Sequence, residues 1–81
     1  MSGISVEEEL KKETEKWLKR IENLEIIPLN EKGEEFLENI RAYIRDCKYF
    51  LARKDLVRAF ECVIWAWAWL EIGKELKFLA T

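Results

Sequence analysis

Apolar residues recur every three or four positions along three stretches of the chain, which is the spacing of one face of an α-helix. These stretches cover residues 5–24, 31–51 and 55–78, and short connections separate them. Connections this short place consecutive helices side by side and antiparallel. The pattern therefore predicts an all-α fold, an up-down-up three-helix bundle in a single domain. The positions that keep the spacing in the first two stretches are Val6, Leu10, Trp17, Ile21 and Leu24, then Phe36, Ile40, Tyr43, Cys47 and Phe50.

Residues at the ends of these stretches support the same boundaries. Ser5 followed by Glu8 has the spacing of a capping box, in which each residue satisfies a free amide of the other at the start of a helix. Pro28 interrupts the chain after the first helix, because a proline disfavours helical backbone in the residue before it. Asn30 and Asp55 are residue types that cap the first turn of a helix.

The third stretch is the most unusual, because Trp65, Trp67 and Trp69 alternate there with alanines. Alternation of large and small residues also suits a β-strand with all three indoles on one face. The flanks favour a helix. Asp55 is a suitable N-cap, and Lys74 and Lys77 stand where the negative end of a helix dipole favours cations. We therefore predict a helix of about 33 Å, at roughly 1.5 Å per residue.

As a helix, the third stretch has two apolar stripes rather than one. One stripe suits the core, and the second has more large side chains than two neighbouring helices commonly cover. The alternative is that this helix is simply central, with one neighbour on each side. Both interpretations stay open at this point. The first stripe holds Leu56, Phe60, Val63, Trp67 and Leu70, and the second holds Trp65, Trp69, Ile72 and Leu76.

Overall composition narrows the class of protein. The net charge of −2 argues against general binding of polyanions. The apolar run from Cys62 to Leu70 is far shorter than the roughly 20 residues of a membrane span. Glutamates 7, 8 and 9 occupy the place where a signal peptide would need an apolar core. We expect a cytoplasmic protein with no contact to a membrane.

Residues for catalysis or metal binding are almost absent. The chain has no histidine, and Cys47 and Cys62 do not form the paired spacing of a zinc site. Its three glycines are isolated, so no phosphate-binding loop is present. Carboxylates alone can do acid–base chemistry only where burial perturbs them, and the candidates are Asp46 and Glu71. Carboxylates at such edge positions more often pair with Lys or Arg. We expect no enzyme activity, no metal and no cofactor.

Positive charge is concentrated in the middle of the chain. Residues 41–58 have a net charge of +4, whereas residues 1–40 have a net charge of −5. Such a cluster can bind an anionic ligand or RNA, with Tyr49 offering a stacking face. The competing interpretation is that these cations face the acidic start of the first helix. The candidate anion-binding residues are Arg41, Arg45, Lys48, Arg53, Lys54 and Arg58.

Two segments, 46–60 and 64–73, resemble an archaeal family called domain of unknown function 357. Members carry an Asp-Ala-x-Tyr-Phe-Leu helix end, a Gly-Asp-Tyr-Val turn and a Tyr-Ala-x-Gly-x-Leu-Asp-Ala-Gly segment. In this chain Lys54 replaces the glycine of the turn, and Trp67 stands where the family often has histidine. The resemblance implies an archaeal origin and a three-helix bundle, and it adds no catalytic residue. The matching positions are Asp46, Tyr49, Phe50, Asp55, Val57, Ala59, Ala66, Leu70 and Gly73.

From these observations we expect a small non-catalytic module that self-associates or binds a protein partner through the second stripe. Binding of an anionic ligand or RNA by the basic cluster is the alternative. Trp67 and Trp69 lie about 200° apart around the helix, so we predict that Trp67 belongs to the core and Trp69 to the interaction surface.

Overall fold

The three helices begin at the capping residues that the sequence predicts. In this computed structural model, which describes residues 5–81, α1 (Val6–Glu22) starts with the capping box. The Ser5 hydroxyl accepts a hydrogen bond from the Glu8 amide at 3.1 Å, and the Glu8 carboxylate accepts one from the Ser5 amide at 3.3 Å. The Asn30 side chain caps α2 (Glu31–Ala52), and the Asp55 carboxylate caps α3 (Leu56–Glu75).

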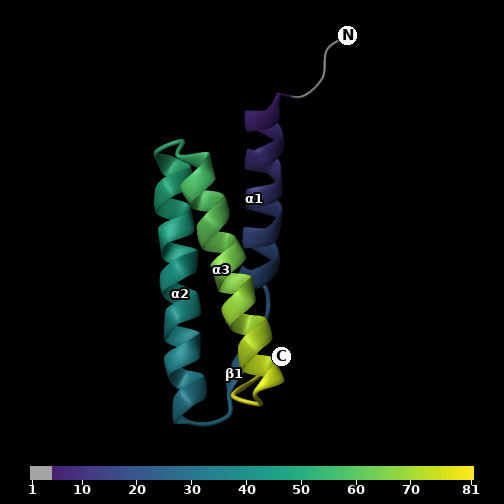
Figure 1. Ribbon diagram of the computed structural model, residues 1–81, viewed down its shortest axis with the longest axis vertical. Coiled ribbons are helices and arrows are strands. Elements are labelled where there is room, and N and C mark those ends of the chain that lie inside the picture. Colours follow the sequence, from purple (N-terminus) through teal and green to yellow (C-terminus); the bar gives the residue numbers. More distant parts are fainter. Residues whose placement is uncertain (1–4) are drawn as a thin grey trace.

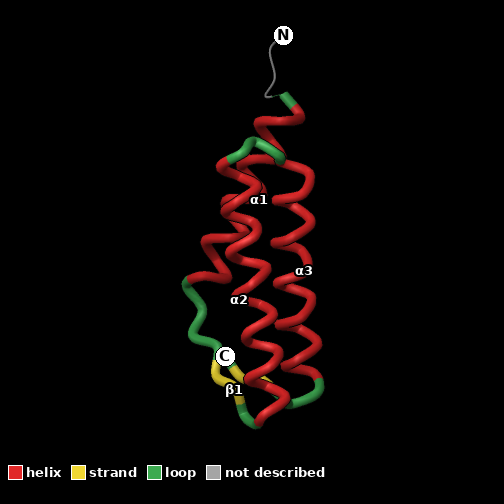
Figure 2. The backbone as a smooth tube through the Cα atoms, turned by 90° about the vertical axis from the view of Figure 1, so that its left-hand side faces the viewer, coloured by secondary structure: helices red, strands yellow, loops and turns green. Residues whose placement is uncertain are grey.

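The helices form the up-down-up arrangement, with α1 and α3 pointing one way and α2 the other (Figure 1). Helix α3 packs against both of the others, whereas α1 and α2 barely touch. Figure 2 shows the consequence, because α3 runs along the right-hand side of the view and both α1 and α2 lie to its left. One long face of α3 is therefore left without a helix over it.

Both α2 and α3 end in the same hydrogen-bonded turn, with a lysine in the left-handed conformation. After α2 the Asp55 amide donates to the Phe50 carbonyl at 2.9 Å, and Lys54 has a φ of 62°. After α3 the Phe78 amide donates to the Gly73 carbonyl at 2.8 Å, and Lys77 also has a φ of 62°. These are Schellman motifs, which most often place glycine at the left-handed position. The second motif ends α3 at Glu75, earlier than the predicted residue 78.

The left-handed backbone at Lys54 predicts a stabilising substitution. We expect Lys54→Gly to raise the free energy of unfolding by up to about 1 kcal/mol, because the left-handed conformation costs an L-residue roughly 1–2 kcal/mol and costs glycine nothing. Greater freedom of glycine in the unfolded chain offsets part of this gain. Urea denaturation measures the change. As the control, Glu38→Gly in the exposed middle of α2 should lower the free energy of unfolding by about 1 kcal/mol. Equal losses in both variants would contradict this explanation.

Two short strands pair with each other at the end of the bundle opposite the α2–α3 turn. Strand β1 (Ile27–Pro28) pairs antiparallel with β2 (Leu79–Ala80), and the register places Ile27 opposite Ala80. The Leu29 amide continues the pairing by donating to the Phe78 carbonyl at 2.9 Å. The sequence pattern did not predict this pair, because two residues are too few to show strand periodicity.

The core lies along the inner side of α3. Small residues of α3, Ala59 and Ala66, are fully buried, and this lets the neighbouring helices approach closely. Thr14 fills a core position of α1, and its hydroxyl donates to the Leu10 carbonyl at 2.8 Å. Such a bond satisfies the buried hydroxyl within its own helix. The largest fully buried side chains are Ile21, Ile40, Val63, Leu70 and Cys47.

Candidate interaction surface

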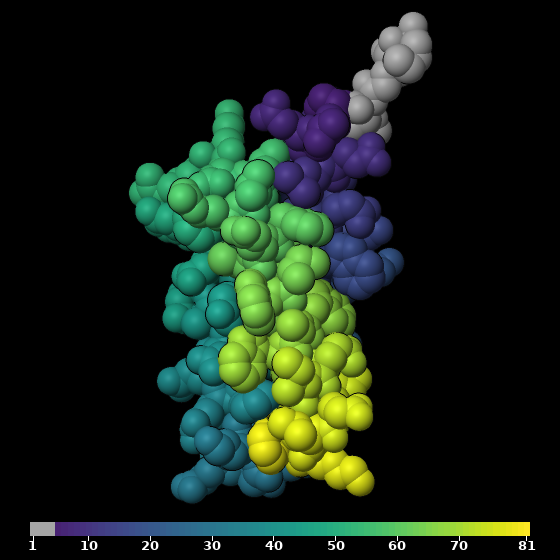
Figure 3. All heavy atoms as spheres, in the orientation of Figure 1, coloured from purple at the N-terminus to yellow at the C-terminus, as the bar shows by residue number. Residues whose placement is uncertain are grey.

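The uncovered side of α3 exposes several large apolar side chains. Figure 3 shows α3 on the face toward the viewer, from green to yellow, with neither α1 nor α2 in front of it. Four large side chains there are about half exposed. Ala68 lies among them and is partly buried. We call this set the α3 outer face, and its exposed fractions are 47% for Ile64, 53% for Trp65, 46% for Ile72 and 53% for Leu76.

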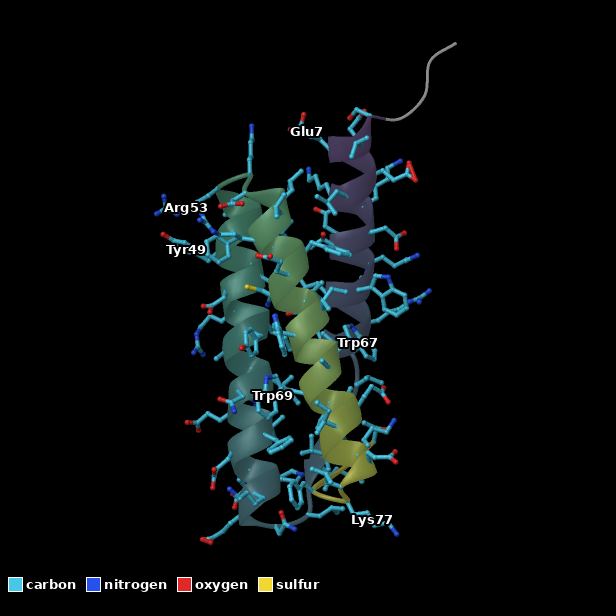
Figure 4. The ribbon with its side chains drawn as sticks, viewed as in Figure 1. Glu7, Tyr49, Arg53, Trp67, Trp69 and Lys77 are labelled. Atoms are coloured by element: carbon cyan, nitrogen blue, oxygen red, sulfur yellow. The ribbon has the colours of Figure 1, made fainter. Side chains whose placement is uncertain are left out.

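The structure separates two tryptophans that the sequence pattern placed together. Trp65 is exposed and stacks beside Tyr43 of α2, with ring centroids 6.5 Å apart. Trp69 instead turns toward α2, where its ring meets Phe36 edge-on at 4.8 Å (Figure 4). The indole nitrogen of Trp69 is buried, and no acceptor among residues 5–81 reaches it. Trp65, Ile72 and Leu76 therefore belong to the α3 outer face, and Trp69 packs within the α2–α3 pair.

A groove between α1 and α3 adjoins the upper end of this face. It has a volume of about 340 Å³ and shares Ile64 with the α3 outer face. The sequence pattern assigned Val6 and Leu10 to the core, yet Val6 is 84% exposed because α1 extends beyond the α2–α3 turn (Figure 1). The remaining apolar walls come from Trp17 and Phe60. Sequence alone gives no signal for this groove, because it depends on where α1 lies against α3.

Three unpaired carboxylates lie beside the α3 outer face. Glu61, Glu71 and Glu75 are exposed, and no Lys or Arg within residues 5–81 forms an ion pair with them. In the groove, Glu9 and Glu13 are the charged lining residues. Hydrogen bonds from Lys16 and from the Trp17 indole lower the pKa of Glu13, so this carboxylate stays ionised.

Trp17 separates the groove from a small group of cations on α1. The Arg20 guanidinium lies 4.7 Å from the centre of the Trp17 ring, and the Lys16 ammonium lies 5.5 Å from it. Both contacts are within the range of cation–π attraction. These cations are therefore engaged with Trp17 at the edge of the groove.

Several of the predicted anion-binding residues have partners within the chain. Lys48 pairs with Glu22 of α1, and Arg58 pairs with Asp55 at 2.9 Å. The Arg53 guanidinium stacks on Tyr49 at 4.5 Å, at the top of α2 in Figure 4. Arg41 and Arg45 are exposed along α2, and Lys54 shares a shallow pocket with Glu7 and Glu8. The structure thus places acidic residues of α1 next to one end of this group, and it pairs two members locally.

Both cysteines are at least partly buried, whereas the two carboxylates that the sequence analysis considered are exposed. Burial raises the pKa of the Cys47 thiol to about 11, which disfavours its reactive thiolate form at neutral pH. Burial also raises the pKa of the Cys62 thiol, and both cysteines are free. Asp46 and Glu71 are exposed. Residues 5–81 contain no group of three or more potential ligands that could hold a metal ion.

None of the helices described has the length and apolarity that crossing a membrane requires.

Comparison with known proteins identifies a family of unknown function. A family model described as "Protein of unknown function (DUF357)" matches residues 9–79. A crystal structure of a protein from Archaeoglobus fulgidus, assigned to the same family, superposes with a TM-score of 0.85. It is 59% identical in sequence, and the match covers 94% of this chain and 97% of that one. A search of the curated proteins finds no match.

Proposed function

We propose, from the premise that this chain belongs to the DUF357 family of proteins of unknown function, that it is a non-catalytic helical interaction module. It binds a protein through the α3 outer face. The observation that carries this proposal is the exposure of Ile64, Trp65, Ile72 and Leu76 on one side of one helix. Monomers seldom expose contiguous apolar patches beyond a few hundred Å², and larger ones mark interaction sites.

The arrangement of the face supports docking of a helix. Ile64, Ala68, Ile72 and Leu76 follow one another at intervals of four residues, which forms a ridge along α3. Ridges of this kind pack into the grooves of a facing helix. Trp65 stands beside the ridge, and tryptophan is enriched among residues that dominate binding energy at interfaces. The helical positions and their exposure therefore suit a helical partner.

Stability measurements test whether this face is free for a partner or belongs to the core. We expect the double variant Ile72→Gln/Leu76→Gln to change the free energy of unfolding by less than about 1 kcal/mol, because exposed positions contribute little. The matched control is Leu70→Ala on the buried side of α3, where a loss of about 2–5 kcal/mol is expected. Urea denaturation at two protein concentrations compares them. A loss in the double variant as large as that of Leu70→Ala, at both concentrations, would show that the face is core.

Site-specific photo-crosslinking in an extract of the source cells tests binding itself. A photoreactive amino acid at position 72 should give a discrete protein adduct, and the same group at position 45 on α2 should not. The adduct should disappear when Trp65 and Leu76 are replaced by glutamine. The absence of an adduct in extract, together with strictly monomeric behaviour on sedimentation, would contradict the proposed function.

A further inference from the structure

We infer that the partner of the α3 outer face is a basic amphipathic helix of another protein, and not a second copy of this chain. This inference rests on the proposed function and names its partner. It follows from the distribution of charge around the apolar ridge. From residue 59 to residue 76 the acidic residues are Glu61, Glu71 and Glu75, and all three are exposed.

Helical spacing places these carboxylates beside the ridge. Residues three or four apart are neighbours on a helix surface. Glu61 is three residues before Ile64 and four before Trp65, so it adjoins both. Glu71 and Glu75 are three residues after Ala68 and Ile72, respectively. Two exposed cations of α3 lie near these carboxylates. Arg58, three residues before Glu61, is paired with Asp55. Lys74, three residues after Glu71, follows Ile72 by about 200° around the helix and lies away from the ridge.

A second copy does not fit this pattern of charge. A two-fold symmetric dimer uses the same patch on both subunits, so it would bring two sets of three unpaired glutamates together. Like charges that meet across an interface oppose association. A cationic partner instead supplies positive charges that can pair with the three carboxylates. Arg41 of α2 lies on the side toward α1, where it lines a pocket with Ile21 and Glu22. Pairing that side with α3 of a second copy joins two different surfaces, which gives a head-to-tail ring or filament rather than a two-fold dimer.

The dimensions of the face set the length of the partner. The ridge from Ile64 to Leu76 spans about 18 Å at roughly 1.5 Å per residue, so about 12–16 helical residues cover it. The partner needs apolar residues at intervals of three or four and Lys or Arg on both sides of that stripe. Ala68 in the middle of the ridge permits a close approach of the two helices.

Two synthetic peptides test the inference. Both have 16 residues with Leu along one helical face, and the flanking positions are Lys in one peptide and Glu in the other. Isothermal titration calorimetry at about 50 mM salt measures their binding to the full chain. We expect the Lys peptide to bind at least about tenfold more tightly than the Glu peptide, and to weaken as salt rises. Ile72→Gln/Leu76→Gln should abolish binding of the Lys peptide.

Charge reversal supplies the matched control. The triple variant Glu61→Lys/Glu71→Lys/Glu75→Lys should prefer the Glu peptide. The control variant Glu15→Lys/Glu25→Lys/Glu38→Lys has the same net charge, changes exposed residues elsewhere, and should still prefer the Lys peptide. Circular dichroism verifies that both variants are folded. A control variant that prefers the Glu peptide as strongly as the first would overturn the inference, because only net charge would then matter.

Other outcomes separate this inference from the proposed function. Equal binding of both peptides, lost in Ile72→Gln/Leu76→Gln, would overturn the basic partner and retain the face as a binding site. A dimer on sedimentation that the same double variant dissociates would also overturn the inference, in favour of a second copy. Failure of both peptides to bind overturns the inference as well, and the crosslink from position 72 then decides the proposed function.

Discussion

Trp67→Ala is expected to lower the free energy of unfolding by about 3–5 kcal/mol, which is the usual cost of removing a large aromatic side chain from a core. The Trp67 ring meets Trp17 of α1 edge-on, with centroids 5.6 Å apart, and its indole nitrogen donates to the Trp17 carbonyl at 3.1 Å. The ring also packs between the two groups of buried residues that form the core. Because α1 barely touches α2, Trp67 is a main attachment of α1 to the rest of the chain.

Two other tryptophans of α3 serve as internal controls. Trp65→Ala should cost less than about 1 kcal/mol, since its ring is 53% exposed. Trp69→Ala should cost more than Trp65→Ala, because the Trp69 ring packs on Phe36. Urea denaturation at two protein concentrations separates core from interface, since stability that depends on association changes with concentration. Equal losses for Trp65→Ala and Trp67→Ala would contradict the division between the core and the α3 outer face.

Gly33→Ala is expected to lower the free energy of unfolding by about 2–3 kcal/mol, although alanine is the better helix former. A Cβ atom at Gly33 would lie 2.1 Å from the carbonyl oxygen of Phe78 and 3.2 Å from Pro28 Cα. Both neighbours are backbone, and the Phe78 carbonyl also accepts from the Leu29 amide. The substitution therefore requires α2, β1 and the turn after α3 to move apart.

Gly73→Ala is the matched control for this prediction. A Cβ atom at Gly73 would meet the side chain of Leu79, with its Cδ1 at 2.5 Å, and Phe36 Cδ2 at 3.1 Å. Side-chain atoms can shift by rotation, and Gly73 lies within α3, where alanine gains about 1 kcal/mol in helix propensity. We expect Gly73→Ala to lose less stability than Gly33→Ala in thermal or urea denaturation. The reverse order would contradict the close backbone contact at Gly33.

Local signals in the sequence were enough to predict the three helices and the residues at which they begin. The capping residues Ser5, Asn30 and Asp55 act locally, so their roles follow from a few neighbouring residues. The flanking residues Asp55, Lys74 and Lys77 also identified α3 as a helix despite its alternating tryptophans. For the left-handed turn at Lys54, the only signal in the sequence is the family resemblance, because the family has glycine at this position and glycine favours left-handed backbone.

Properties that depend on several helices could not be predicted. The sequence gives the angle of Trp69 around α3, but it does not show on which side of α3 the helix α2 packs. The sequence analysis therefore assigned Trp69 to the same stripe as Trp65. Ile64 belongs to the α3 outer face and was missed, although its spacing from Ile72 and Leu76 is a multiple of four. The groove beside it required the position of α1, and the strand pair required contacts between residues about 50 positions apart.

One NMR experiment tests most directly whether the α3 outer face is a free binding surface. Isoleucine methyl signals are measured with a soluble paramagnetic probe, first on the monomer and then with the Lys peptide bound. We expect the methyls of Ile64 and Ile72 to broaden in the monomer and to become protected with the peptide. Those of Ile21 and Ile40, which are 1% and 0% exposed, should be protected throughout. Ile64 and Ile72 methyls as protected as Ile40 in the free monomer would contradict the interaction surface, because that result would place them in the core.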